Sequence, residues 1–154
     1  MGQFTVRTAT LADLRILKNF EQEIIGAERP FDETLERDPI SYYDLQELIL
    51  ADTALVLLAE FNSRVVGSGY GLIRDAKPYL DHKKFTYLGF MYTDAEYRGK
   101  GVNKAIVEAL LEWSKSKGIT EVRLTVYNDN APAIRAYQKV GFKKHIVEMR
   151  VNVG

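Results

Sequence analysis

Residues 87–104 read YLGFMYTDAEYRGKGVNK and predict a strand, a glycine turn and the start of a helix. The first six residues are mostly aromatic or apolar, with a high preference for strands, and an Asp-Ala-Glu break follows them. Gly99 and Gly101 can adopt positive φ, which lets a backbone approach a ligand closely. The helix after them points its free N–H groups and its positive dipole end at the same place. This stretch therefore predicts an anion-binding site.

Two well-known phosphate loops do not match this turn. A Walker A loop ends in Gly-Lys-Ser or Gly-Lys-Thr, whereas Ala105 follows Lys104 and the required glycine spacing is absent. A dinucleotide-binding G-x-G-x-x-G motif would need glycine at position 104. A solvated turn ahead of a helix is the alternative to an anion site, because Gly and Lys are both common in turns.

The composition indicates one globular domain over residues 1–154, with 46% hydrophobic and 27% charged residues. Lys plus Arg and Asp plus Glu each number 21, so the net charge is zero. A chain without a general basic field is not expected to bind nucleic acid or an acidic membrane, and any anion binding must be local.

The absence of cysteine excludes a disulfide framework, a thiolate metal site and a cysteine nucleophile. The longest apolar run, residues 54–59, is too short to span a bilayer, and the N-terminus lacks an apolar signal core. His82 and His145 are too few and too far apart in sequence to suggest a metal site. We therefore expect a cytoplasmic protein without a membrane anchor or a metal.

The first half of the chain predicts a strand at residues 3–8, a helix from about 14 to Gly26, a loop over 27–40 and a short helix after 44. Residues 54–61 and 65–73 predict a hairpin. Its second strand carries alternate glycines at 67, 69 and 71, which leave one face bare for a ligand or for a closely packed helix.

The second half continues with a helix that begins after the glycine turn and ends near Gly118. A strand at 121–127 follows, and such a strand–helix–strand run predicts a parallel, right-handed crossover. Asn130 is placed to cap a further helix that ends at Gly141. Alternating apolar residues then predict a final strand, namely Val147, Met149, Val151 and Val153.

Two motifs resemble the signatures of the GNAT family of N-acetyltransferases. Residues 98–103, RGKGVN, are similar to the family's pyrophosphate loop, [RQ]-x-x-G-x-[GA], except that Asn103 stands where Gly or Ala is usual. Residues 130–142 fill every named position of N-x-x-A-x-x-x-Y-x-x-x-G-F, which are Asn130, Ala133, Tyr137, Gly141 and Phe142. The order of elements also agrees over nearly the whole chain, although residues 143–154 leave little room for the usual last hairpin, which is then shortened or merged.

The resemblance implies an α/β (α+β) fold, with a mixed central sheet flanked by about four helices. Two central parallel strands, residues 85–92 and 122–127, would splay apart to hold acetyl-CoA. By the same resemblance, backbone groups of Phe90, Met91 and Tyr92 would pair with the pantetheine arm and the acetyl carbonyl. Asn130 would reach pantetheine from the other side, and the pyrophosphate would lie on Arg98, Gly99, Lys100, Gly101, Val102, Asn103 and Lys104.

Tyr137 would contact the cofactor and, as the catalytic acid, protonate the departing thiolate of CoA, unless it is only a packed helix-face aromatic. The central strand lacks the carboxylate that many family members use as a base. Glu60, His82 and Asp94 are candidates that could act through water, although an ordinary surface or turn residue is the favoured interpretation of each.

The acceptor site is expected in the loop around Glu28, Arg29, Asp32 and Glu33, because acidic groups suit a cationic amine; a solvated loop without acceptor contacts is the alternative. The expected function is transfer of acetyl from acetyl-CoA directly to a primary amine of a small molecule, peptide or protein. A non-catalytic acyl-CoA-binding regulatory domain is the alternative. A homodimer is compatible with both.

Overall fold

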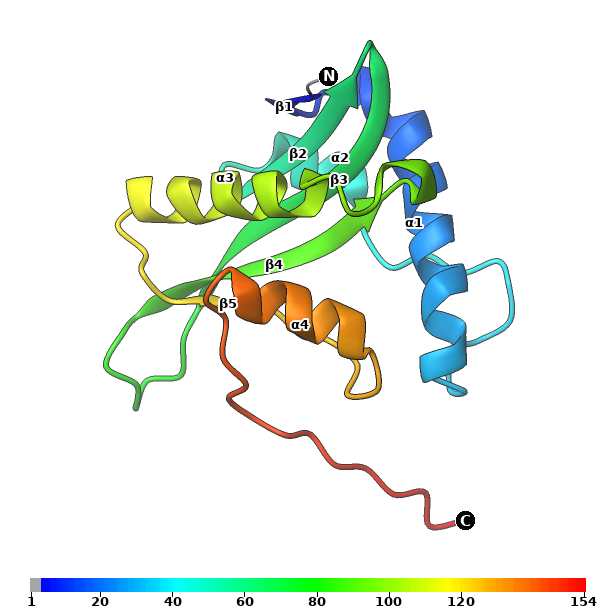
Figure 1. Cartoon of the computed structure of the whole chain (residues 1–154). Helices are drawn as coiled ribbons and strands as arrows, with labels where there is room; N and C mark the ends of the chain where they lie inside the picture. The colour runs from blue at the N-terminus through cyan, green and yellow to red at the C-terminus, as the bar shows by residue number, and fades with distance from the viewer. Residues whose placement is uncertain (1–3) are drawn as a thin grey trace.

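The computed structural model describes residues 4–154 and contains a five-stranded sheet in the order β1-β2-β3-β4-β5 (Figure 1). The first four strands are antiparallel and β5 is parallel to β4, so the predicted mixed α/β fold is confirmed. The elements in chain order are β1 (Phe4–Thr8), α1 (Leu14–Glu28), α2 (Leu45–Leu50), β2 (Ala54–Phe61), β3 (Arg64–Asp75), β4 (Lys84–Thr93), α3 (Val102–Ser116), β5 (Val122–Arg123) and α4 (Ala131–Lys139).

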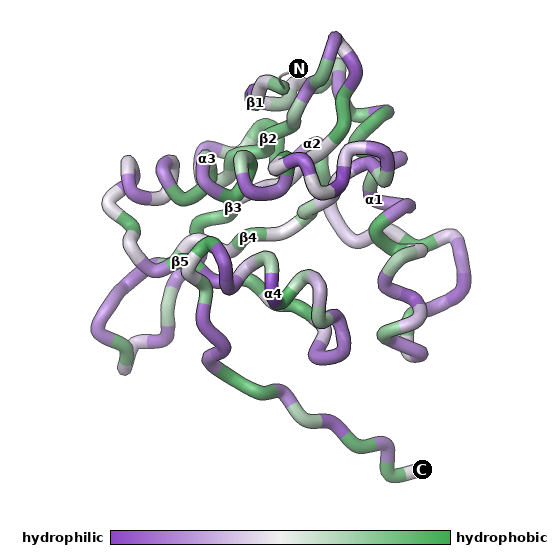
Figure 2. Tube along the Cα trace, in the orientation of Figure 1, coloured by the Kyte–Doolittle hydropathy of each residue, from purple (hydrophilic) through white to green (hydrophobic). Residues whose placement is uncertain are grey.

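The sheet separates two hydrophobic clusters, because successive side chains of a strand point to opposite faces. On β2, Val56 and Leu58 belong to the cluster formed with α1 and α2, whereas Leu57 and Ala59 belong to the cluster formed with α3. The apolar colouring of β2 in Figure 2 reflects burial on both faces. No helix within residues 4–154 is both long enough and apolar enough to cross a bilayer.

The alternate glycines of β3 are explained by a helix that packs against them. A Cβ atom added at Gly69 would lie 2.8 Å from a methyl carbon of Ile106, and one added at Gly71 would lie 3.0 Å from the Trp113 ring. Both neighbours belong to α3. Of the two interpretations of the bare strand face, close helix packing therefore describes the structure.

The start of α1 is fixed to β1 through Asp13. Its carboxylate accepts hydrogen bonds from the Arg7 guanidinium at 2.8 Å and from the Thr10 backbone N–H at 2.8 Å. These contacts lower the pKa of Asp13 to about 2, although its burial acts in the opposite direction. The helix then runs to Glu28, past Gly26 where we expected it to end, so Glu28 lies on its last turn.

Two predictions for the C-terminal part were wrong. The strand predicted at 121–127 pairs only at Val122 and Arg123. The final strand predicted from Val147 to Val153 is absent, and residues 143–154 form an exposed, irregular segment that is not part of the sheet. Apolar residues do alternate over residues 147–153. A strand must also pair with the edge of a sheet, however, and this segment lies beside no such edge within residues 4–154.

Candidate functional site

The parallel pairing of β4 and β5 ends after two residue pairs, Thr86 with Val122 and Tyr87 with Arg123. Beyond this point β4 continues to Thr93, while the chain after β5 turns toward α4 (Figure 1). A hydrogen bond of 2.8 Å between the hydroxyls of Tyr87 and Thr125 lies just past the last pair. We call the region between the two diverging backbone segments the wedge; this divergence is the splay that the resemblance implied.

A β-bulge in β4 borders the wedge. The register with β3 shifts between Ser68 and Tyr70, and Phe90 has a φ of 59°. The Phe90 ring is buried, and its carbonyl accepts a hydrogen bond of 3.0 Å from the Ser68 hydroxyl. Past Tyr87, the edge of β4 that would face β5 has no strand partner within residues 4–154, so Met91 and Tyr92 lie on a part of this edge where backbone groups can bind a ligand.

The glycine turn has the backbone conformation that its sequence suggests. Gly99 and Gly101 have φ values of 75° and 85°, and Gly101 is the N-cap of α3 without a side-chain cap. No heavy atom lies within 4 Å of a Cβ built on either glycine. Both glycines and the first residues of α3 also line the cleft described next, so an anion bound there can reach the first N–H groups of the helix.

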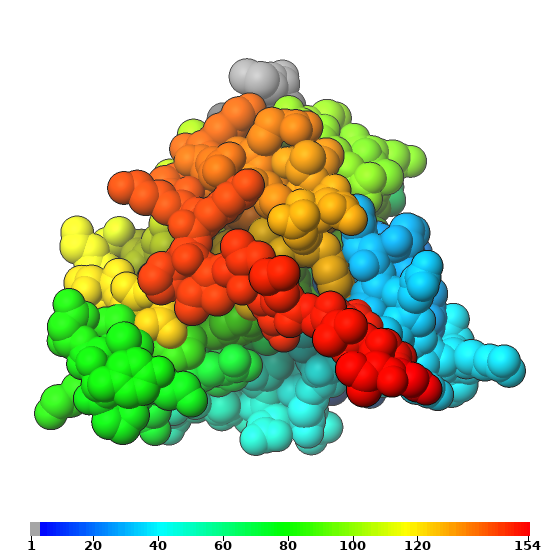
Figure 3. All heavy atoms as spheres, turned by 90° about the horizontal axis from the view of Figure 1, so that it is seen from below, coloured from blue at the N-terminus to red at the C-terminus, as the bar shows by residue number. Residues whose placement is uncertain are grey.

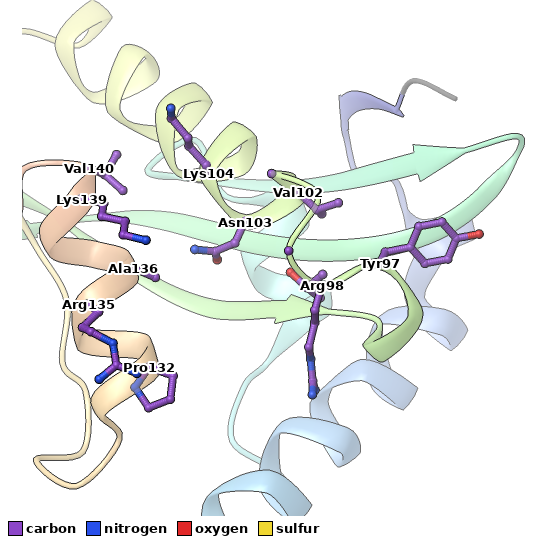
Figure 4. Close-up of a pocket in the computed structure, with 13 residues that line it drawn as sticks. Tyr97, Arg98, Val102, Asn103, Lys104, Pro132, Arg135, Ala136, Lys139 and Val140 are labelled. Atoms are coloured by element: carbon purple, nitrogen blue, oxygen red, sulfur yellow. The ribbon is translucent and has the colours of Figure 1, made fainter. Parts of the chain in front are cut away.

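A cleft of about 450 Å³ separates this turn from α4 (Figure 4). Asn103 extends from α3 toward α4, and Lys139 extends from α4 back toward α3. The wall on the side of the turn consists of Thr93, Tyr97, Arg98, Gly99, Gly101, Val102, Asn103 and Lys104. The α4 wall consists of Pro132, Arg135, Ala136, Lys139 and Val140.

The cleft is locally basic although the chain as a whole is neutral. None of its four cations forms an ion pair in the part of the chain that the structure describes: Arg98, Lys104, Arg135 and Lys139. No acidic side chain is among the described residues that line the cleft. Lys100, by contrast, lies over the Tyr97 ring, 5.3 Å from its centre, and does not line the cleft.

Arg135 and Lys139 were missed by our sequence interpretation. They are four residues apart and so share one face of α4, which was a usable signal. Arg135 lies between the motif residues Ala133 and Tyr137, and Lys139 lies two residues after Tyr137. The motif itself assigns neither of them a role.

Asn130 and Tyr137 lie at the two ends of α4. The Asn130 side-chain oxygen caps the helix by accepting from the Ala133 N–H at 3.4 Å, which leaves its amide NH₂ group available. The Tyr137 ring packs against Phe142 with 5.8 Å between ring centres. Among residues 4–154 its hydroxyl has no hydrogen-bond partner, and burial, with smaller effects of Glu28 and Tyr87, raises its pKa to about 12.

Glu28 connects Tyr137 to the expected acceptor region. Burial raises the pKa of this half-buried carboxyl, although the nearby Tyr42 hydroxyl lowers it. The Tyr42 hydroxyl is itself buried and lacks a partner in hydrogen-bond geometry among the described residues. Together with burial, the charge of Glu28 also raises the pKa of Tyr127. The Glu28 carboxyl and the Tyr42 and Tyr127 hydroxyls are therefore near enough to influence one another's pKa.

Asp32 and Arg29 are already engaged within the loop. Asp32 accepts hydrogen bonds from the Thr34 hydroxyl and, at 2.9 Å, from the Tyr127 hydroxyl, and Arg150 lies 3.5 Å away. Arg29 bonds Asp38 at 2.7 Å. Neither side chain is as available to a ligand as Glu28.

The three base candidates are held in other contacts. Glu60 pairs with Arg7 and Asp94 with Arg64, the latter at 2.9 Å. His82 contacts Asp81 and Arg123 through its two ring nitrogens. None of these three side chains contributes to the raised pKa of Tyr137. The described residues also contain no group of three His, Cys, Asp or Glu side chains arranged to hold a metal.

Comparison with known proteins identifies the family of the chain. Residues 18–142 match the acetyltransferase (GNAT) family. Human N-acetyltransferase 8B is 36% identical over 87 residues, which are 56% of this chain and 37% of that protein, so the chain spans well under half of this relative.

Two solved structures show the same fold at low sequence identity. A mutant of a Bacillus halodurans protein superposes with a TM-score of 0.83 at 20% identity, covering 97% of this chain and 99% of that one. A predicted acetyltransferase from Clostridium acetobutylicum, solved with acetyl-CoA, gives 0.73 at 19% identity, covering 98% and 97%.

Proposed function

The chain belongs to the acetyltransferase (GNAT) family, and on that premise we propose that it transfers acetyl from acetyl-CoA directly to a primary amine of a small molecule, peptide or protein. The observation that supports this most is the wedge itself. The basic cleft lies beside it at the N-terminus of α3, and Glu28 is near enough to Tyr137 on α4 to add to the rise in pKa that burial causes there. An acyl donor and an amine can meet between them.

Acetyl-CoA would bind with its phosphates in the basic cleft. The N–H groups of residues 99–104 and the side chains of Arg98, Lys104, Arg135 and Lys139 supply donors and positive charge there. The unpaired edge of β4 at Met91 and Tyr92 would bind the pantetheine arm and polarise the acetyl carbonyl, and the Asn130 amide would approach from the α4 side. The structure solved with acetyl-CoA has the same fold, which supports this arrangement.

The reaction forms a C–N bond and breaks the C–S bond of the thioester. As the sulfur departs with its electron pair, the Tyr137 hydroxyl donates a proton to it. A phenol with its pKa raised to about 12 remains protonated at neutral pH and is therefore ready to act as the acid. Because its hydroxyl has no partner among residues 4–154, no competing hydrogen bond must break first.

The acceptor would be bound through Glu28. Burial disfavours the ionised form of Glu28. A cationic amine placed between this carboxylate and the surrounding phenols would favour the ionised form again. The same carboxylate would then accept the proton that the amine must lose before it attacks. Asp32, by contrast, would hold the loop in place rather than contact the amine.

A non-catalytic acyl-CoA-binding regulatory domain is the second candidate, favoured by one observation: β4 carries no carboxylate or histidine. For either function we place the protein in the cytoplasm as a single domain over residues 1–154, without nucleic acid, membrane or metal as a partner.

The experiment that separates the two functions measures free CoA thiol after acetyl-CoA is mixed with the protein and a panel of amines and peptides. A transferase releases thiol only when an accepted amine is present. A binding domain is stabilised by acetyl-CoA in thermal melting but releases no thiol with any member of the panel.

A further inference from the structure

The glycine turn that lines the cleft is held at its first end by an arginine of another element. A two-residue turn, with φ values of 51° at Asn62 and 67° at Ser63, joins β2 to β3, so Arg64 is the first residue of β3. Its guanidinium donates at 2.9 Å to the carboxylate of Asp94, which follows the last residue of β4. The Asp94 N–H donates at 2.8 Å to the carbonyl of Val66. The segment that enters the turn is therefore fixed to the start of β3.

Arg64 also contacts the residues between Asp94 and the turn. Asp94 accepts from the Glu96 N–H at 3.0 Å, which begins a short 3₁₀ helix that ends at Tyr97. The Arg64 guanidinium lies 5.5 Å from the centre of the Tyr97 ring and bonds the Glu96 carboxylate at 3.3 Å. Tyr97 itself lines the cleft, and Arg98 follows it directly. One side chain of β3 thus orders the approach to the turn.

The other end of the turn rests on the same strand. Helix α3 begins at Val102, whose side chain is buried. A Cβ atom added at Gly67 of β3 would lie 2.7 Å from a methyl carbon of Val102 and 3.0 Å from the Tyr92 carbonyl oxygen. Val102 is β-branched and short, so it cannot swing aside as a long side chain could. A side chain at position 67 would therefore displace the start of α3.

We infer that Arg64 and Gly67 are positioning residues that fix both ends of the glycine turn to β3 and so set the affinity of the chain for acetyl-CoA. The inference rests on the proposed binding of the cofactor phosphates at this turn. A turn that is already ordered loses less conformational freedom when a ligand binds. Neither Arg64 nor Gly67 is among the described residues that line the cleft, so both act through the turn.

Calorimetric titration with acetyl-CoA, at a temperature where every variant is folded, tests the first end. Arg64→Ala should raise the dissociation constant by roughly three- to tenfold, because it removes a half-exposed ion pair and a cation–aromatic contact. Arg64→Lys can keep the bond to Asp94 and should recover most of the affinity. A wild-type dissociation constant for Arg64→Ala would overturn the inference.

Lys84→Ala is the matched control for this end. It removes an exposed ion pair of 2.7 Å with Asp75, which joins β3 and β4 at their other ends. In Figure 3, the green loop between β3 and β4 lies on the opposite side of the face from the yellow-green segment that precedes α3. Lys84→Ala should leave the dissociation constant unchanged. An increase equal to that of Arg64→Ala would contradict a specific role for Arg64.

Two glycine variants test the second end. Gly67→Ala should raise the dissociation constant by roughly tenfold, because it forces α3 away from β3 at the turn. Gly71→Ala is its control, since that Cβ would meet the Trp113 ring, far along α3, at 3.0 Å. Both variants should melt lower, but Gly71→Ala should bind acetyl-CoA as the wild type does. Equal affinities of the two would overturn the role of Gly67. The surface variant Arg64→Ala decides the inference if Gly67→Ala does not fold.

Amide hydrogen exchange without ligand separates this inference from the proposed function. The N–H groups of Asp94 and Tyr97 before the turn, and of Ala105 after it, all donate to backbone carbonyls. In Arg64→Ala all three should exchange faster, while Ala76 in the loop between β3 and β4 should not change. Faster exchange at Ala105 is the decisive sign, because loss of the ion pair alone would affect only the near side of the turn. Wild-type protection at Ala105 would refute the inference. A wild-type protein that binds no acetyl-CoA would instead contradict the proposed function.

Discussion

The Tyr127 hydroxyl donates a hydrogen bond of 2.9 Å to Asp32, which ties the chain after β5 to the loop after α1. The Phe31 and Tyr127 rings stack beside this bond, with 5.9 Å between their centres. Bonds from Thr34 and Tyr127 lower the pKa of Asp32 to about 2, so the acceptor stays ionised across the physiological range. One end of the wedge is thereby connected to the segment that carries Glu28.

Gly101→Val should abolish the rise in melting temperature that acetyl-CoA produces. Valine is strained at a φ of 85°, so the turn that lines the cleft could not keep its conformation. Gly118→Val is the matched control, because Gly118 has a φ of 76° and lies at the other end of α3. Both variants should melt lower without ligand. If Gly101→Val retains the full ligand-induced shift, the turn does not bind the cofactor.

Replacing Arg135 and Lys139 together with alanine should raise the dissociation constant of acetyl-CoA by roughly 100-fold or more, since each charged hydrogen bond to a phosphate contributes on the order of 1.5 kcal/mol. The affinity should also depend less on salt concentration. Calorimetric titration at two salt concentrations measures both effects. Alanine at Lys115 and Lys117, at the far end of α3, is the control. An unchanged affinity would remove α4 from the anion site.

Glu28→Gln should raise the acceptor KM by roughly tenfold or more and leave the KM for acetyl-CoA unchanged, because it removes a charge from a partly buried site. Burial raises the pKa of Glu28, so its charge is present above that pKa and is lost as the pH falls through it. The ratio of wild-type to variant kcat/KM for the amine should therefore decline toward one at acidic pH. A ratio that is constant with pH would contradict an ionised Glu28 at the acceptor site.

Local features of the chain could be predicted from its sequence, whereas features that depend on long-range packing could not. The turn at Gly99 and Gly101 and the cap at Asn130 depend on neighbouring residues, so the sequence could predict them. The cleft depends on how α4 lies against α3, which brings Arg135 and Lys139 opposite the turn; no local pattern reports that distance. The prediction of the final strand was wrong for a similar reason, because alternating apolar residues predict an extended chain but not the sheet edge that it would pair with.

Tyr137→Phe should lower kcat by roughly 10²- to 10⁴-fold and leave the acetyl-CoA dissociation constant nearly unchanged, because it removes only the proton donor. A purely structural tyrosine would instead change stability with little effect on turnover. Since the hydroxyl has no partner within residues 4–154, the melting temperature should barely change. Steady-state kinetics and melting of the same variant measure both. A stable variant that retains a third or more of the wild-type kcat, with chemistry rate-limiting, would contradict the acid role.

The central claim is that the wedge transfers acetyl to an amine, and the most direct measurement follows a labelled acetyl group from acetyl-CoA. The label should appear in an amide of the acceptor in an amount equal to the CoA thiol released. No label should remain covalently attached to the protein when the amine is omitted, because transfer is direct. Acetyl-CoA that binds in the cleft yet passes no label to any amine, peptide or protein tested would contradict the account.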